Sequence, residues 1–246
     1  MNGAFVTMLA AETGAEMRQN FRAPEFLIPT LALPVIFYLL FGITLSRGGS
    51  ETATYLLATY GVFAVMGPAL FGFGAGVAAE REKGWLRIKR VSPAPGASYV
   101  LAKLMTTLVF GAMALAPIYL AAGFLGGVAL PRIDWLLLLG THLLSVLPFS
   151  LLGLAIGFSF GSGAAIAFAN IAFLGLAVLG GLWFPIMLFP SFMQQLAAWL
   201  PSFHLAEIGL SIVAGGDRPV GMHLTVIAIS TLVLGALALW RWSIQR

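Results

Sequence analysis

The stretch WLLLLGTHLLSVLPFSLLGLAIGFSFGSGAAIAFANIAFLGLAVL, residues 135–179, decides the fold because it holds no charged side chain. The sequence in fact lacks Asp, Glu, Lys and Arg throughout residues 135–206. A helix needs about 20 predominantly apolar residues to cross a bilayer. The stretch therefore predicts two spanning helices, residues 133–159 and 164–188, joined by a tight turn near residues 161–163.

The rest of the chain has the same apolar character. Of its 246 residues 60% are hydrophobic and 9% are charged, and the mean hydropathy is +0.97. A soluble domain has about 25% charged residues, so soluble and disordered classes are excluded. The sequence predicts one domain, residues 1–246, that is an all-α polytopic membrane protein with six transmembrane helices. The four further spans are residues 26–45, 55–78, 99–125 and 220–240.

The distribution of Lys and Arg predicts how the spans are oriented, since these residues are retained on the cytoplasmic side of a membrane. They are concentrated in the amino-terminal segment, in the carboxyl tail and after the second span, where Lys103 is included. Only Arg47, Arg132 and Arg218 fall on the other side. We therefore expect a multi-pass protein of the cytoplasmic (inner) membrane with both termini cytoplasmic. The net charge of +4 reflects topology, and no nucleic-acid partner is expected.

Residues 1–25 have a helical amphipathic pattern. At 100° per residue Val6 and Phe21 fall on one face, while Glu12 and Glu16 fall on the opposite face. This pattern predicts an amino-terminal helix that lies in the membrane interface. Glycines at helical spacing, which let helices approach closely in lipid, predict helix packing at Gly72, Gly76, Gly153, Gly157 and Gly161.

The connection after the second span, residues 80–97, begins EREKGWLRIKRVSPAP. Its acids and bases directly continue an uncharged span, so we expect the helix to extend into the cytosol as a polar stalk. Gly84 loosens that helix, and Pro93 and Pro95 end the segment that follows. Apolar residues among the bases, such as Trp85, favour a partner over a purely solvated loop. A short cytoplasmic helix between two spans is predicted.

A second informative segment follows the fifth span. Pro185, Pro190 and Pro201 cannot all lie in one straight helix, so the chain must bend. Because unpaired backbone groups are costly in lipid, an irregular apolar loop is disfavoured. The chain is therefore predicted to bend back near the outer surface within residues 189–213, before the last span.

These features together resemble the permease subunits of ABC-2 type ATP-binding-cassette exporters. In that family the cytoplasmic loop forms a coupling helix that docks on the nucleotide-binding subunit. The resemblance implies a coupling role for Glu80, Arg81, Glu82, Lys83, Gly84, Trp85, Leu86, Arg87, Ile88, Arg90 and Val91. Short external re-entrant helices are likewise implied, with the motif residues Trp183, Pro185, Pro190, Pro201, His204 and Glu207.

The resemblance also implies where the energy comes from. The chain contains no Gly-x-x-x-x-Gly-Lys-Ser/Thr motif, so it is not expected to bind ATP or to be an enzyme. Mg-ATP would be bound by a partner ATPase subunit, and a second permease subunit would complete a homodimer or heterodimer in the lipid bilayer. The expected substrate is amphipathic or lipid-like and moves out of the cytoplasm or inner leaflet. No cofactor or metal is expected in this chain.

An intramembrane serine hydrolase or protease is the alternative. Gly157-Phe158-Ser159-Phe160-Gly161 formally fits the Gly-x-Ser-x-Gly pattern, with His142 or His204 as the base. That pattern requires a strand-turn-helix, whereas here it closes a predicted membrane helix. Neither histidine has a metal-ligand neighbour at helical spacing. For His142, within a span, a hydrogen bond to another helix is the expected role.

Overall fold

The computed structural model describes residues 2–22, 24–45, 49–86, 96–215 and 219–244, and within these the side chains of all but residues 2–4, 24–27 and 96–97. This part of the chain is helical and contains no strand. Its elements are α1 (Asn2–Phe21), α2 (Pro24–Phe37), the π-helical η1 (Tyr38–Thr44), α3 (Ser50–Phe73), α4 (Ala75–Glu82), α6 (Gly96–Phe124), α7 (Arg132–Leu144), α8 (Val146–Ser159), α9 (Ser162–Leu179), the 3-10 helix η2 (Ile186–Leu188), α10 (Ser191–Ala197), α11 (Pro201–Val213) and α12 (Gly221–Ile244).

Within the described residues, five helices are long and apolar enough to cross a bilayer. They are Ser50–Glu82 (α3 with α4), Ser98–Phe124 in α6, Arg132–Ser159 (α7 with α8), Ser162–Leu179 (α9) and Gly221–Ile244 (α12). The first predicted span, residues 26–45, forms α2 and η1, whose apolar part Ile28–Thr44 is shorter. With α10 and α11 counted together there are up to six. The predicted all-α polytopic membrane class is confirmed, and the exact membrane boundaries stay predictions.

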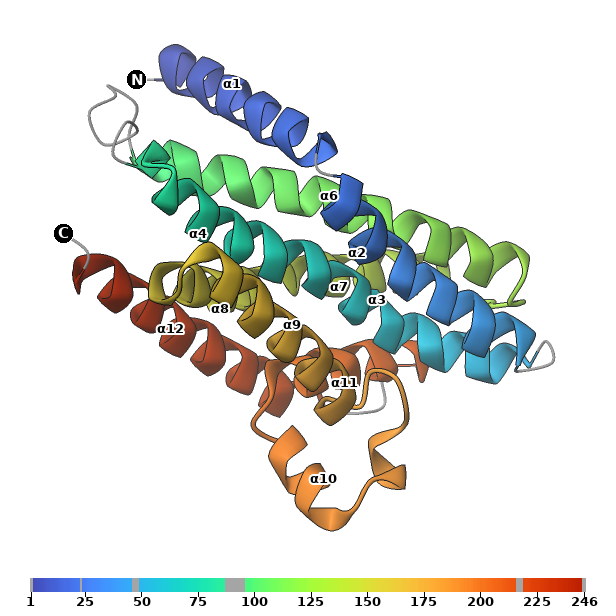
Figure 1. Ribbon diagram of the computed structural model, residues 1–246. Coiled ribbons are helices and arrows are strands. Elements are labelled where there is room, and N and C mark those ends of the chain that lie inside the picture. The colour runs from blue at the N-terminus through green and yellow to red at the C-terminus, as the bar shows by residue number, and fades with distance from the viewer. Residues whose placement is uncertain (1, 23, 46–48, 87–95, 216–218, 245–246) are drawn as a thin grey trace.

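Helix α3 lies at the centre of the bundle (Figure 1). It packs against α2, η1, α6, α8, α9 and α11. Almost every side chain from Leu56 to Leu70 is buried, because small and large apolar residues alternate around the whole helix. The following helix α4 continues α3 toward the end of the bundle where both chain termini lie (Figure 1). The stalk therefore extends directly from the most buried helix.

Glycine packing is confirmed for α8. A Cβ atom on Gly153 would lie 3.0 Å from the Leu70 carbonyl oxygen, and one on Gly157 would lie 2.7 Å from the Gly74 carbonyl oxygen. Gly72 and Gly76 differ, because a Cβ atom on either would have no neighbour closer than 3.6 Å outside its own helix turn. At these two positions the neighbouring helix is at ordinary van der Waals distance, and both glycines also line a cavity described below.

The segment after α9 bends as the prolines predict, but the bend begins earlier. Helix α9 ends at Leu179 instead of residue 188, since Gly180 caps it and Gly181 adopts a φ of +70°. Pro190 precedes α10 and Pro201 begins α11. The two helices meet at an angle of 86°. This geometry fits either a broken span or a re-entrant loop, and the external placement stays a prediction.

Helix α1 lies alongside the first half of α6 (Figure 1). The Phe21 and Phe110 rings are 5.2 Å apart, and Glu16 pairs with Lys103. Val6 and Phe21, on the predicted apolar face, are exposed, whereas Glu16 on the opposite face is buried. The polar face thus packs against the bundle and leaves apolar side chains available to lipid. Placement in the membrane interface stays a prediction.

Candidate functional site

The polar stalk ends in a defined helix terminus. The Lys83 amide donates to the Ala79 carbonyl, and the Gly84 amide donates to the Arg81 carbonyl over 3.1 Å. Gly84 has a φ of +76°, a left-handed conformation that glycine adopts easily at the end of a helix. The helix therefore ends before Gly84 rather than only loosening there, and the next segment begins at this residue.

Glu80 joins α4 to two other helices through buried groups. Its Oε2 atom accepts a hydrogen bond of 2.5 Å from the Tyr99 hydroxyl, and its Oε1 atom accepts one of 2.7 Å from Lys103 Nζ. Lys103 Nζ also donates to Glu16 Oε2 over 3.0 Å. All three charged side chains are at least nine-tenths buried. A buried lysine held by two carboxylates therefore links α4 to α6 and α1.

Lys103 was counted with the cytoplasmic charges although it falls within the predicted span 99–125, and its side of the membrane stays a prediction. Lys103 lies inside α6, within the helix Ser98–Phe124 that is apolar enough to span the membrane. A charge is costly in lipid unless it faces the bundle interior and is paired. Glu16 and Glu80 supply that pairing, and their position near Lys103 is not visible in the sequence.

Arg81 holds the end of α8. Its Nη1 atom donates to the Phe158 carbonyl oxygen and its Nη2 atom donates to the Phe160 carbonyl oxygen, each over 2.7 Å. The last carbonyls of a helix have no partner within the helix and carry a partial negative charge. Arg241 of α12 donates to the neighbouring Ser159 carbonyl over 3.4 Å. Two cations thus satisfy the carboxyl end of α8.

Glu82 holds the start of α9, on the other side of the same turn. Its carboxylate accepts hydrogen bonds from the Ser162 amide over 2.9 Å and from the Ser162 hydroxyl over 2.5 Å. A carboxylate at a helix amino terminus satisfies a free amide and opposes the helix dipole favourably. A Cβ atom on Gly161 would lie 2.7 Å from Glu82 Oε1, so a larger residue at position 161 would displace this carboxylate. The hairpin predicted between residues 159 and 164 is therefore clamped by the stalk.

The remaining predicted coupling residues divide into three groups. Leu86 is buried in a cluster with Val77, Tyr99 and Phe158, and so anchors the chain after the stalk. Trp85 is 54% exposed and Lys83 is also exposed. Arg87, Ile88, Arg90 and Val91 lie outside the described residues.

The residues of the external motif serve different roles. Trp183 packs its ring between Phe37 and Phe63, with centroids 5.3 and 5.5 Å away. Pro185 and Pro190 precede η2 and α10. His204 is buried, donates from Nε2 to the Ala198 carbonyl over 2.9 Å, and meets His223 of α12 with 2.8 Å between the Nδ1 atoms. This histidine pair is not visible in the sequence, because nineteen positions separate the two residues.

The serine hydrolase alternative fails on geometry. Ser159 donates its hydroxyl to the Ala155 carbonyl at the end of α8. His142 donates from Nε2 to the Ala58 carbonyl and accepts from the Tyr119 hydroxyl, so it joins α7, α3 and α6. His204 pairs with His223. No serine–histidine pair exists among these residues, and no group of three potential metal ligands occurs in the described part of the chain.

The fold and these contacts define a multi-pass membrane protein whose described polar groups link helices to one another. Residues 43–240 match the family described as ABC-2 family transporter protein, and the chain belongs to that family. The chain is also 28% identical over 233 residues to the Bacillus subtilis (strain 168) protein named "Putative transport permease YvfS", covering 93% of this chain and 95% of that relative. The ABC-2 prediction is confirmed: this is a transport permease and not an enzyme.

Proposed function

We propose that this chain is the permease subunit of an ATP-driven exporter, energised by a separate nucleotide-binding subunit that carries Mg-ATP. The observation that supports this most strongly is the convergence at the end of α4. Within three residues, Glu80 contacts groups on α6, Arg81 contacts the end of α8 and Glu82 contacts the start of α9. Through Lys103 the same point reaches α1. A force applied after Gly84 would therefore act on most of the bundle at once.

The docking surface proposed for the ATPase begins at Trp85 and continues through the basic segment after it. An exposed tryptophan next to positive charges suits a protein interface, where aromatic and Arg residues contribute most binding energy. The buried neighbour Leu86 anchors Trp85 to the bundle. Two permease subunits, identical or different, would pair above two ATPase subunits, with both termini of each permease on the cytoplasmic side of the inner membrane.

Outward transport of an amphipathic or lipid-like molecule fits the short connections at the far end of the bundle. The chain between η1 and α3 and that between α6 and α7 are too short to form a domain that captures a substrate from outside. Substrate would enter from the cytosol or from the inner leaflet.

The docking role of Trp85 predicts a loss of partner binding. Replacing Trp85 by Ala removes a large exposed contact, and we expect the permease to retain the ATPase subunit at least tenfold less well in a co-purification from detergent. Trp199→Ala is the matched control, since Trp199 is 80% exposed and lies beside α10, away from the stalk. If both variants co-purify with the ATPase as well as the parent protein does, Trp85 is not part of the docking surface.

A further inference from the structure

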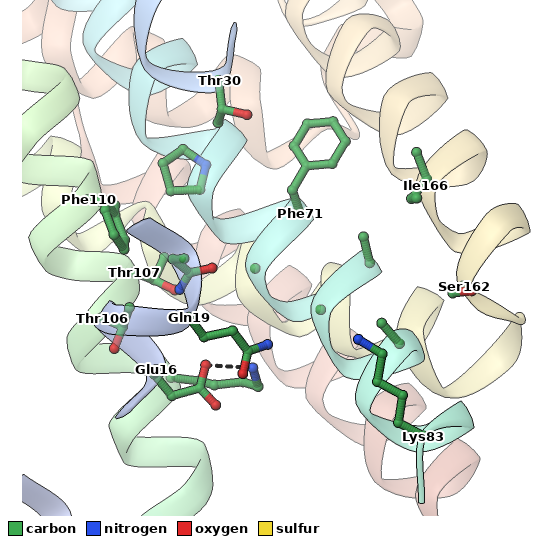
Figure 2. Close-up of a pocket in the computed structure, with 17 residues that line it drawn as sticks. Glu16, Gln19, Thr30, Phe71, Lys83, Thr106, Thr107, Phe110, Ser162 and Ile166 are labelled. Atoms are coloured by element: carbon green, nitrogen blue, oxygen red, sulfur yellow. Dashed lines mark hydrogen bonds and ion pairs between the residues drawn. The ribbon is translucent and has the colours of Figure 1, made fainter. Parts of the chain in front are cut away.

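A cavity of about 340 Å³ lies between α1, α2, α3, α4, α6 and α9. Figure 2 shows how its walls differ along its length. Thr30, Phe71 and Phe110 surround one end, and Glu16, Gln19 and Lys83 surround the other. Because α4 ends at Glu82, the charged end lies at the level of the stalk, and the aromatic end lies deeper in the bundle. A mainly apolar pocket with a few polar groups at one end matches a ligand that has a polar head and an apolar tail.

We infer that this cavity binds an amphipathic molecule with an anionic head, such as a phosphate monoester or diester on a hydrocarbon tail. The inference rests on the proposed function and deepens it, because the molecule bound in this cavity would be the one exported from the inner leaflet. The evidence for the site comes from three features of the cavity wall.

Thr106 is the first feature. It lines the cavity and is 97% buried, yet its hydroxyl has no hydrogen-bond partner among the described residues. Other helical threonines here, such as Thr54 and Thr231, donate to the carbonyl four residues earlier. A buried hydroxyl without a partner is costly, so its presence at a cavity indicates a partner supplied by a ligand.

The glycines of α3 and α4 are the second feature. The nearest atom to a Cβ on Gly72 would be Thr107 Oγ1, at 3.6 Å. A Cβ on Gly76 would lie 3.7 Å from Lys103 Nζ. Helix packing therefore does not require glycine here, in contrast to Gly157. What the two glycines provide is space, because any larger side chain at either position would extend into the cavity.

The charge of the polar end is the third feature. Lys103 is already held by the carboxylates of Glu16 and Glu80. Lys83 lines the same cavity, and the described part of the chain supplies no acidic partner for it. Among the described residues that line the cavity, Lys83 is thus a cation available to a ligand, and it favours an anionic head over a cationic one.

The test uses the permease alone, without nucleotide, in nanodiscs of phosphatidylcholine. The probe is a phosphatidic acid analogue with a photoreactive diazirine in its tail, and labelled peptides are identified by mass spectrometry. We expect labelling in α6 around Phe110, reduced at least fivefold in Gly76→Leu, which fills the cavity. Gly175→Leu is the matched control, because Gly175 also has open space around it but lies outside the cavity. Thr106→Val, which keeps the side-chain shape, should reduce labelling about threefold.

Two further arms test the chemistry of the ligand. Lys83→Gln should weaken labelling by the phosphatidic acid analogue but leave labelling by an analogue with a cationic head unchanged. Excess inorganic phosphate should not compete, because the tail contributes to binding. Equal labelling in the parent protein, Gly76→Leu and Thr106→Val would show that the probe does not bind in this cavity. Competition by inorganic phosphate would show that the site recognises phosphate alone and not an amphipathic molecule. Since no ATPase is present, either failure is distinguishable from failure of the proposed coupling.

Discussion

Replacing Lys103 by Met is expected to destabilise the protein by about 3–5 kcal/mol, since the change leaves two buried carboxylates without their shared cation. For a chain of this size the apparent melting temperature would fall by about 10 °C. Thermal denaturation in detergent, followed by intrinsic tryptophan fluorescence, measures the effect. The exposed Arg18→Met change on α1 is the control for loss of a positive charge and should shift the melting temperature little.

A compensated variant separates loss of pairing from loss of packing. In the triple variant E16Q/E80Q/K103M no charge remains in this buried cluster, and the Tyr99 hydroxyl can still donate to an amide oxygen at position 80. Replacing a complete buried ion pair by neutral groups is often close to neutral in stability. We therefore expect the triple variant to recover most of the melting temperature lost in the single variant. Equal destabilisation in both would show that Lys103 contributes through packing and not through its charge.

The second large effect is expected at the end of the stalk. Gly84→Pro is incompatible with the observed φ of +76°, because proline fixes φ near −65°, and it removes the amide that donates to the Arg81 carbonyl. The last turn of α4 should then open, which would release Arg81 and Glu82 from the α8–α9 hairpin. We expect ATP hydrolysis to continue while ATP-driven movement of the permease falls at least tenfold.

That movement can be measured at the far end of the bundle. The chain contains no Cys, so a Met187→Cys change introduces one unique thiol for a fluorophore, and Met187 is 77% exposed. The fluorescence change on adding Mg-ATP to the reconstituted complex reports coupling. Gly84→Asn is the matched control, since asparagine tolerates left-handed backbone geometry. A full response in Gly84→Pro would contradict the role assigned to this turn.

Most of the fold follows from the sequence, because the length of each apolar run sets the helices. The stalk was predictable for the same reason, since Glu80 and Arg81 continue an uncharged helix without a break. The end of α9 was not, because Gly180 and Gly181 interrupt a run that stays apolar on both sides. Hydropathy does not change at this point, whereas the backbone leaves the helical conformation at Gly180 and Gly181.

The site was predicted only in part, because its contacts join residues far apart in the chain. The resemblance implied a coupling role for Glu80 and Glu82 in the stalk but not what they contact. In the structure both carboxylates bind groups of this chain, Tyr99 and Lys103 for the first and Ser162 for the second. Eighty residues separate Glu82 from Ser162. The hydrogen bond expected for His142 to a neighbouring helix is confirmed, although its partners Tyr119 and Ala58 could not be named in advance.

The most direct test of the whole account is the location of residue 85. A Trp85→Cys variant carries the only thiol of the chain, so a membrane-impermeant maleimide reports its side of the membrane without ambiguity. We predict no labelling in intact cells, full labelling after permeabilisation, and protection from labelling when the ATPase subunit is bound. Labelling of residue 85 from outside intact cells would contradict the account, because the stalk would then face away from any source of ATP.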